Sequence, residues 1–318
     1  MKIVEPQVEL WKQEPTLEGA WHQIARATRV CYQSKSRDGE SDEAFVNRVI
    51  LKPVTREDGS IDFDKCHGAM LEHGTIYLTI PDTDEITSAI RYVNNKYSKV
   101  MFGAIYGDKE NNYVTTNMRV ILENNWQDDL KFISAPTYHA RRTAFSVITD
   151  IGVTRELNRH RTFSIAEQST RYCDLTRNRF GDCLNFPVPS WINKDSLETS
   201  EVDNFLLSVM SSDLRYADSD EINNFNIYND EKTWNDIDFY IYANIVAQYC
   251  YKALRNKGWR PEQARQVLPL GLKTQAVYTA FDDDWQHFIK LRADNVSGKV
   301  HPNMKIIADK IKELFNNK

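Results

Sequence analysis

The chain has 318 residues, of which 41% are hydrophobic and 27% are charged, and its formal net charge is −5. This is the composition of an ordinary globular protein, and the length suffices for one large or two modest domains. The mild acidity argues against general nucleic-acid binding, which favours a broad basic surface. No apolar run approaches the roughly 18 residues that a membrane span needs, so we expect no membrane association.

Cysteine and glycine usage argue against several further kinds of site. The five cysteines are an odd number, widely scattered, and form no Cys-x-x-Cys pair, so they suggest neither a disulfide framework nor a zinc ribbon. Residues 1–6 lack the apolar core and the cleavage site of a signal peptide, and we expect a reduced, cytoplasmic setting. No two glycines are spaced as Gly-x-Gly, so the sequence has neither a dinucleotide-binding fingerprint nor a phosphate loop.

Hydrophobic periodicity and capping residues predict strands and helices along the whole chain. The predicted strands are residues 1–11, at a sheet edge, 75–80, 143–147 and 275–281. The predicted helices are residues 16–27, two short ones opening at Ser41 and Asp62, 151–157, 234–257, a short one opening at 260, 285–293 and 302–315. Residues 194–231 are predicted to be acidic, polar helix and loop, and Gly258 is expected to end the long helix as its C′ residue.

The short helix predicted to open at Asp62 carries two histidines and a glutamate. His67 lies five residues before Glu72 and six before His73, and neither spacing is the i, i+4 of two helical metal ligands. We therefore predict no metal site here. For His73 the sequence favours a structural histidine that caps the helix end.

The most basic segment, residues 155–179, has six arginines and one histidine in 25 residues. Arg159, His160 and Arg161 are consecutive, so they cannot all share one face of a helix or strand. Such a triplet suits a turn that grips an anion from several sides, because guanidinium groups match phosphate geometry. Ser169, Thr170 and Arg171 follow with hydroxyls and another guanidinium. On spacing alone, a solvated basic loop remains an equal alternative.

The triplet, followed after seven residues by Ser169, resembles the signature of the flavin-dependent thymidylate synthases. The resemblance extends through Ser164, Glu167, Gln168, Arg171 and Tyr172. Three further segments resemble parts of that family in the same order, namely residues 66–73, 262–269 and 287–294. In most family members the strand before the signature follows closely, whereas 86 positions separate His73 from Arg159 here. We interpret residues 81–138 as an insertion that forms a small appended hairpin or helix pair.

The resemblance implies an α+β fold with a central, mostly antiparallel twisted sheet flanked by helices, in one domain over residues 1–318. It implies a homotetramer whose active sites are shared between subunits. The implied activity is that of a methyltransferase which converts dUMP to dTMP. Methylenetetrahydrofolate would supply the carbon, FAD would be the cofactor, and reduced nicotinamide (NADPH) would supply the electrons.

The resemblance also implies the site residues. Those expected to bind dUMP are Glu156, Arg159, Glu167, Gln168, Ser169, Thr170, Arg171, Arg265 and Arg292. Those expected to bind FAD are His67, Glu72, Arg159, His160, Arg161, Glu167 and His287. Arg292 is the expected catalytic residue; an arginine stays protonated, so it would stabilise negative charge on the uracil ring rather than act as a base. No base beside Ser169 is evident, so we favour a phosphate ligand over a nucleophile there.

Four positions depart from the family pattern. Phe281 and Asp283 stand where the family commonly has asparagine and arginine that help hold the flavin, Ala69 replaces a hydroxyl, and Glu156 replaces a glutamine. Either the flavin site is weakened, or residues of the insertion hold the flavin in place of the missing ones. One alternative is thus a diverged relative that binds pyrimidine nucleotides with a weakened flavin site. Another is a non-enzymatic RNA-binding module, which the acidic balance counts against.

Overall fold

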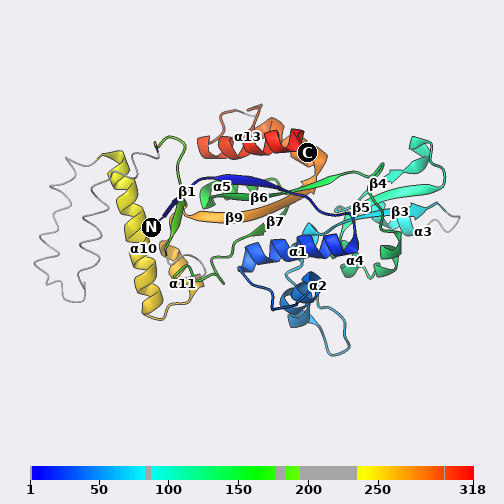
Figure 1. Cartoon of the computed structure of the whole chain (residues 1–318), viewed down its shortest axis with the longest axis horizontal. Helices are drawn as coiled ribbons and strands as arrows, with labels where there is room; N and C mark the ends of the chain where they lie inside the picture. Colours follow the sequence, from blue (N-terminus) through cyan, green and yellow to red (C-terminus); the bar gives the residue numbers. More distant parts are fainter. Residues whose placement is uncertain (1, 83–86, 177–182, 194–234, 297) are drawn as a thin grey trace, which may run out of the picture. The chain divides into compact units, whose positions relative to one another are not determined.

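A computed structural model describes residues 2–82, 87–176, 183–193, 235–296 and 298–318 (Figure 1). The predicted acidic segment 194–231 lies outside the described residues. The chain divides into two compact units. Unit 1 comprises Met1–Pro6, Thr149–Gly152 and Ser169–Lys273; unit 2 comprises Gln7–Ile148, Val153–Gln168 and Thr274–Lys318.

A four-stranded sheet forms the centre of unit 2. Its order is β2 (Gln7–Trp11), β6 (Arg142–Asp150), β9 (Lys273–Phe281) and β7 (Ser164–Glu167). β2 pairs with β6, and β7 pairs with β9, and both pairs are antiparallel. The strands predicted at 143–147 and 275–281 are confirmed, and the antiparallel sheet flanked by helices agrees with the expected fold class.

Both faces of this sheet are covered, because alternate residues of a strand point to opposite sides. Phe145 and Tyr278 belong to one buried cluster, together with residues of α12 (Asp282–Arg292) and α13 (Pro302–Asn316). Ala144 and Val277, each one residue away, belong to another cluster together with residues of α1 (Leu17–Tyr32). Figure 1 shows α13 on one side of the sheet and α1 on the other.

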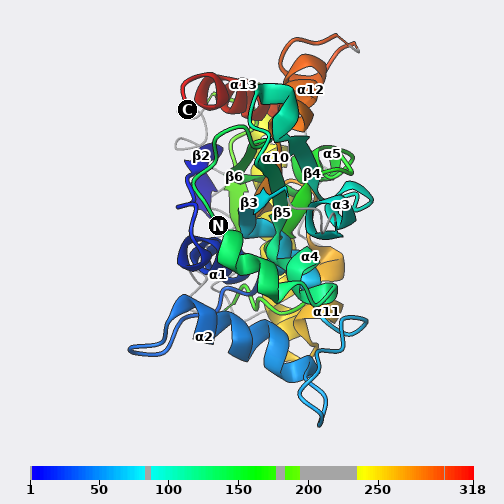
Figure 2. The same cartoon turned by 90° about the vertical axis from the view of Figure 1, so that its right-hand side faces the viewer.

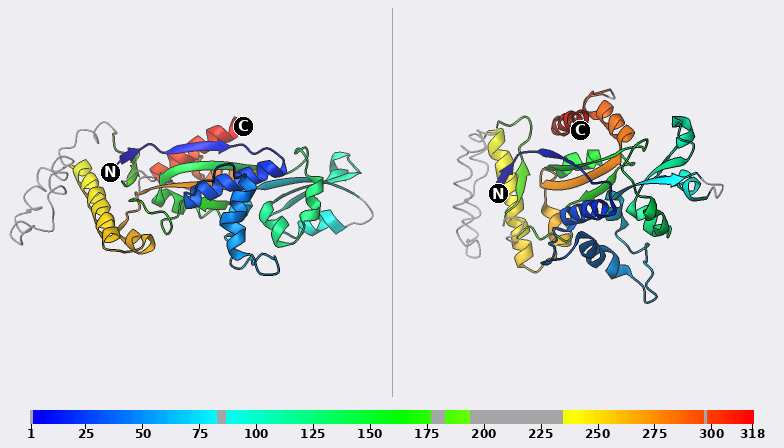
Figure 3. Two further views of the ribbon diagram at one scale, coloured as in Figure 1. Left: turned by 60° about the horizontal axis from the view of Figure 1, so that its bottom comes forward. Right: turned by 45° about the vertical axis from the view of Figure 1, so that its right-hand side comes forward.

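Two N-terminal helices begin where their capping residues predict. The hydroxyl of Thr16 accepts from the backbone N–H of Gly19 at the start of α1, and Ser41 caps α2 (Asp42–Val46) in the same way. The two helices pack side by side (Figure 3). α1 runs five residues past its predicted end at Ala27, because Thr28 and Val30 continue its buried face.

The segment 81–138 is built into a second sheet of unit 2. This sheet has the order β3 (Thr75–Pro81), β5 (Asn111–Asn117), β4 (Lys99–Phe102), with both pairs antiparallel (Figure 2). The helical elements of the segment are α3 (Thr87–Val93), η4 (Gly103–Tyr106), α4 (Met118–Glu123) and η5 (Gln127–Phe132). The expected hairpin is therefore present as β4 and β5. Val114 and Ile121 share the buried cluster of α1, so the segment contributes to the core.

Unit 1 contains a two-stranded parallel sheet and one long helix. Strand β1 (Lys2–Val4) pairs with β8 (Asn185–Pro187), and the helices are α10 (Asp236–Asn256), α11 (Pro261–Ala264) and the single turn η8 (Arg265–Val267). A capping box from Asn235 and Asp238 opens α10, and Gly258 follows it with a positive φ of 89°. The predicted long helix and its glycine stop are thus confirmed.

Two predictions need correction. Residues 1–11 form two strands of different sheets rather than one, because Pro6 has no N–H for a ladder and interrupts the run. The helix predicted to open at Asp62 is a turn followed by the 3₁₀ helix η3 (Gly68–His73). The Asp62 carboxylate pairs with Arg56 and Lys65 in that turn, and glycine at position 68 disfavours a continuous helix.

Three further helical elements of the described residues are short. They are α5 (Ile151–Leu157), which was predicted with these bounds, η1 (Asn47–Leu51) and η2 (Lys52–Val54). Among the helices that the structure describes, none combines the length and the apolarity that crossing a bilayer requires.

Candidate functional site

The basic triplet forms a tight turn directly after α5. Backbone N–H groups of Arg159 and His160 donate to the carbonyls of Glu156 and Leu157, which closes the turn. The side chains of Arg159 and Arg161 are exposed, whereas His160 is half-buried. The triplet therefore presents two exposed guanidinium groups, while the imidazole between them in sequence is partly covered. Neither exposed arginine forms an ion pair with any described residue, so both guanidinium groups are available to an anion.

His160 is held between aromatic rings and Arg292. Its ring stacks on Phe163 with centroids 5.5 Å apart, and it meets the edge of Phe288 at 4.9 Å. Arg292 Nε donates to His160 Nε2 over 3.4 Å, and Arg292 Nη1 donates to Glu156 Oε2 over 3.5 Å. The structure thus brings together three of the expected site residues: Glu156 at the end of α5, His160 in the turn and Arg292 at the end of α12.

The protonation state of His160 follows from this environment. Burial, assisted by the positive charges of Arg292 and His287, lowers the pKa of His160 to about 4. The imidazole is therefore neutral at neutral pH. A neutral imidazole has one unprotonated nitrogen, and the bond from Arg292 assigns that role to Nε2. Arg292, which always carries its charge, is fixed from one side by an uncharged acceptor.

Glu167 is held on β7 by neutral donors. Its Oε1 accepts from the hydroxyls of Thr154, at 2.8 Å, and Thr274, at 3.1 Å. Its Oε2 accepts from the side-chain amide of Asn158 at 3.4 Å, and Asn158 in turn accepts from the hydroxyl of Tyr278 at 3.0 Å. No described arginine forms an ion pair with Glu167. The next residue, Gln168, continues the strand pairing through its backbone N–H.

A second group of expected site residues lies in unit 1. Arg265 Nη1 donates to the hydroxyl of Thr170 over 3.2 Å, and the backbone N–H of Arg171 donates to the hydroxyl of Ser169 over 3.2 Å. The exposed guanidinium of Arg171 lies 5.4 Å from the centre of the Tyr172 ring. Two hydroxyls and a guanidinium thus lie side by side, next to an exposed arginine, which is a donor set that suits an oxyanion.

His67 precedes η3 in unit 2 and Glu72 lies within it, and the two residues differ in exposure. His67 is exposed, and its ring meets the edge of Tyr32 with centroids 5.9 Å apart. Glu72 is buried, and its Oε1 accepts from Arg119 Nη1 over 2.7 Å. The sequence gives no signal for Arg119, because it lies 47 residues after Glu72 and only the pairing of β3 with β5 brings the two together.

The two positions that depart most from the family pattern contact the segment 81–138. Lys99, on β4, forms an ion pair with Asp283, and its ammonium lies 4.5 Å from the centre of the Phe281 ring. Both residues at the junction of β9 and α12 therefore bind a lysine of the same unit. Asp283 is negatively charged and Phe281 is apolar. These two residues therefore do not supply the hydrogen-bond donors for an anion that asparagine and arginine would supply.

Comparison of the sequence with known proteins identifies a family to which the chain is similar. Residues 134–318 match the family described as thymidylate synthase complementing protein (Thy1). A probable flavin-dependent thymidylate synthase of Paramecium bursaria Chlorella virus 1 is 28% identical over 182 residues, which are 54% of this chain and 67% of that protein.

Two crystal structures of the UMP/dUMP methylase PolB from Streptomyces cacaoi align over 100% of this chain, with a TM-score of 0.39. The one bound with 5-Br dUMP is 16% identical with 93% of that chain covered, and the one bound with 5-Br UMP is 17% identical with 92% covered. Because the family match spans more than half of the 318 residues, this chain belongs to the thymidylate synthase complementing protein family.

Proposed function

We propose that this protein is a flavin-dependent thymidylate synthase, a methyltransferase that converts dUMP to dTMP. Methylenetetrahydrofolate supplies the carbon, and NADPH supplies the reducing equivalents through FAD. The observation that carries the proposal is the fixed position of Arg292 between His160 and Glu156, within a chain of this family.

Arg292 is the proposed catalytic residue. Its Nε and Nη1 are engaged by the protein, while none of the described residues accepts from its Nη2. That nitrogen is free to donate to a uracil carbonyl, where negative charge develops when the ring becomes nucleophilic. A preorganised donor of this kind typically accelerates a reaction by about 100–1,000-fold.

The donors of unit 1 are the proposed phosphate ligands. Ser169, Thr170, Arg171 and Arg265 combine hydroxyls with two guanidinium groups, and a charged hydrogen bond to a phosphate contributes about 1.5–3 kcal/mol. The Ser169 hydroxyl already accepts from the N–H of Arg171 and keeps its own proton to donate. A phosphate ligand needs only that proton, whereas a nucleophile would need a base. The remaining residues proposed to contact dUMP are Glu156, Arg159, Glu167 and Gln168.

The proposed flavin ligands fit an anionic, ring-bearing cofactor in part. Arg159 and Arg161 are exposed cations without an ion pair in the described part of the chain, which suits a pyrophosphate. His67 and His287 are exposed imidazoles, and His160 and Glu167 complete the set. Glu72, which is paired with Arg119, adds no positive charge, and neither do Phe281 and Asp283. When bound, FAD would supply hydride to complete the methyl group; the chain's own residues supply charge and placement.

We propose that the catalytic domain spans residues 1–318 and assembles as a cytoplasmic homotetramer with shared active sites. This part of the proposal rests on family membership. It predicts a particle of four 37.0 kDa chains in solution.

The contact of Lys99 with Asp283 and Phe281 favours a second candidate. In it the protein is a diverged relative that keeps a pyrimidine-nucleotide site but binds flavin weakly, because the junction of β9 and α12 is occupied by the chain's own lysine.

One pair of measurements separates the two candidates. The purified protein is examined for flavin absorption, and tritium release from dUMP labelled at ring carbon 5 is followed with methylenetetrahydrofolate and NADPH. A yellow protein that releases tritium only with all co-substrates supports the synthase. A colourless protein that binds dUMP without releasing tritium after FAD is added supports the diverged relative. Absence of dUMP binding contradicts both.

A further inference from the structure

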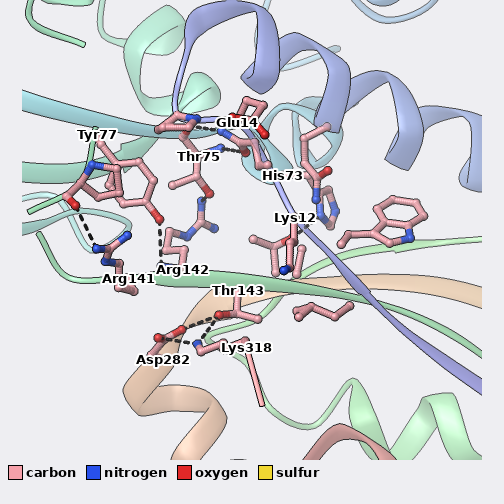
Figure 4. A pocket seen from close by; sticks show the side chains of 18 residues that line it. Lys12, Glu14, His73, Thr75, Tyr77, Arg141, Arg142, Thr143, Asp282 and Lys318 are labelled. Carbon is pink, nitrogen blue, oxygen red and sulfur yellow. Dashed lines mark hydrogen bonds and ion pairs between the residues drawn. The ribbon is translucent and has the colours of Figure 1, made fainter. Parts of the chain in front are cut away.

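Unit 2 contains a cavity of about 540 Å³ that none of the proposed catalytic or ligand residues lines. Its walls come from the end of β2 and the loop that leads to α1, from the start of β6, and from the junction of β9 and α12 (Figure 4). The volume lies within the roughly 300–1,000 Å³ of small-molecule sites.

Positive charge dominates the lining. Four cationic side chains, Lys12, Arg141, Arg142 and Lys318, face two carboxylates, Glu14 and Asp282, an excess of two positive charges in a chain whose net charge is −5. Lys318 is compensated, because its ammonium lies 2.6 Å from Asp282 Oδ2. The other three cations form no ion pair with any described residue. A concave surface with uncompensated positive charge favours an anionic occupant.

Arg142 is the most constrained of these cations. Its Nη1 donates to the Glu72 carbonyl at 3.0 Å and to the Thr75 hydroxyl at 3.3 Å, and its Nη2 donates to the Ser164 hydroxyl at 3.3 Å. All three acceptors are neutral. Burial lowers the pKa of Arg142 to about 10, so the guanidinium still carries its charge at neutral pH. The carboxylates of Glu72 and Asp284 oppose this effect of burial but form no ion pair with Arg142 within the described residues. A buried charge without a directly paired counter-charge is costly, and an anion in the cavity would offset that cost.

Three lining residues also carry buried polar atoms without a hydrogen-bond partner in the described structure. These are Arg142 Nε, a donor, Gln23 Oε1, an acceptor on a side chain that is only 1% exposed, and His73 Nε2. All three atoms are covered by protein, so they do not contribute to the surface that an occupant would contact.

Part of the wall is apolar. Leu10, Trp11, Pro15, Pro136 and Ala144 line the cavity beside the ring of Tyr77. An inorganic ion would leave this surface uncovered, whereas an organic body would bury it. Small-molecule sites commonly combine a mostly apolar lining with a few placed polar groups.

We propose that this cavity is a binding site for a small organic oxyanion, a metabolite bearing a carboxylate or a phosphate group. Lys12 and Arg141 hold its charged group from the rim, and Arg142 provides fixed positive charge beneath it. The site is separate in its residues from the proposed synthase machinery, so its existence does not depend on the proposed activity.

Calorimetric titration of the full chain at low ionic strength tests the proposal. Three probes are used: inorganic phosphate, ribose 5-phosphate and citrate. The variants are Lys12→Gln, Arg141→Gln and their combination, with Lys52→Gln as the control for an exposed lysine outside the cavity. Lys12 and Arg141 are exposed, and within the described residues the hydrogen bond of the Arg141 side chain is to the Pro136 carbonyl, so their variants are expected to fold.

Saturable binding of ribose 5-phosphate or citrate is expected, tighter than that of inorganic phosphate. The double variant is expected to lose about 10- to 100-fold in affinity, which follows from the removal of two charged contacts. Lys52→Gln should bind like the parent, and dUMP binding should be equal in all four variants. Preference for one organic probe identifies the carboxylate or the phosphate as the ligand group. Binding that is absent, or equal in the double variant and the parent, overturns the proposal.

Discussion

Arg292 donates from Nε to His160 Nε2 across 3.4 Å, joining residues 132 positions apart in the chain. The acceptor is neutral because its pKa lies near 4, so the bond orients the guanidinium without cancelling its charge. On the other side of the guanidinium, Glu156 Oε2 lies 3.5 Å from Arg292 Nη1 and forms an ion pair with it. One neutral acceptor and one carboxylate therefore hold the Arg292 guanidinium in position, and its charge is not fully neutralised.

Substitution of Arg292 is expected to abolish turnover without loss of the cofactor. Arg292→Ala should lower kcat for tritium release from dUMP by about 100–1,000-fold, the usual cost of removing a preorganised electrostatic donor. The flavin spectrum should be unchanged, because the cofactor is assigned to other side chains. Lys290→Ala, an exposed cation of the same helix, serves as the matched control. Normal turnover in Arg292→Ala would show that the catalytic role is assigned wrongly.

The arginine beside Thr170 is expected to act on substrate binding. Arg265→Ala removes a guanidinium that lies 3.2 Å from the Thr170 hydroxyl, and it should raise KM for dUMP by about 10- to 100-fold, with little change in kcat. Arg171→Ala should behave similarly. The control is Arg260→Ala, which removes an exposed arginine five residues before Arg265. An equal loss of kcat in Arg265→Ala would contradict a pure binding role.

His73 is expected to make the protein sensitive to acid. Burial, reinforced by the charge of Arg142 and opposed by the Ile165 carbonyl, lowers the pKa of His73 from 6.5 to about 3. Between these values the unfolded chain binds a proton that the folded chain excludes, so the free energy of unfolding rises with pH across this window.

Urea denaturation at several pH values measures that effect. His73→Gln retains a side chain that can bond to the Thr279 hydroxyl, which lies 2.8 Å from His73 Nδ1, and it should flatten the pH dependence between about pH 3 and 6.5 relative to the parent. The control is His22→Gln, since His22 is exposed. A parent and a His73→Gln variant with parallel pH profiles would show that His73 titrates normally.

Glu167 is expected to contribute to stability as well as to the site. Three neutral donors converge on its carboxylate, and Glu167→Gln places an amide N–H₂ group against at least one of them. We expect a loss of about 1–3 kcal/mol in the free energy of unfolding, the cost of leaving a buried polar group unsatisfied. Denaturant unfolding of Glu167→Gln against the exposed Glu57→Gln measures it. An unchanged midpoint would mean that the side chain adapts without loss.

Local patterns in the sequence were sufficient for most elements near the site. Proline at the first position of α11, the glycine after α10 and the alternation of residues 143–147 each act within a few residues, so their consequences can be read along the chain. The same applies to α5, whose apolar face and following basic triplet were predicted together. The turn at Asp62 was missed because Asp62 pairs with Arg56, six residues earlier, a contact that helical periodicity does not predict.

The sequence by itself determined β6 and β9 of the central sheet, the helices α1, α12 and α13 that cover it, the basic turn after α5 and the resemblance that links the chain to its family, but it did not predict β7 or the separate strand β2. Tertiary structure alone decided that Arg119 pairs with Glu72, that Lys99 occupies the junction of β9 and α12, and that Arg142 lies at a cavity without a carboxylate partner. The physical reason is that periodicity specifies which face of an element is buried. It does not specify which distant element covers that face, and charges and cavities depend on that second choice.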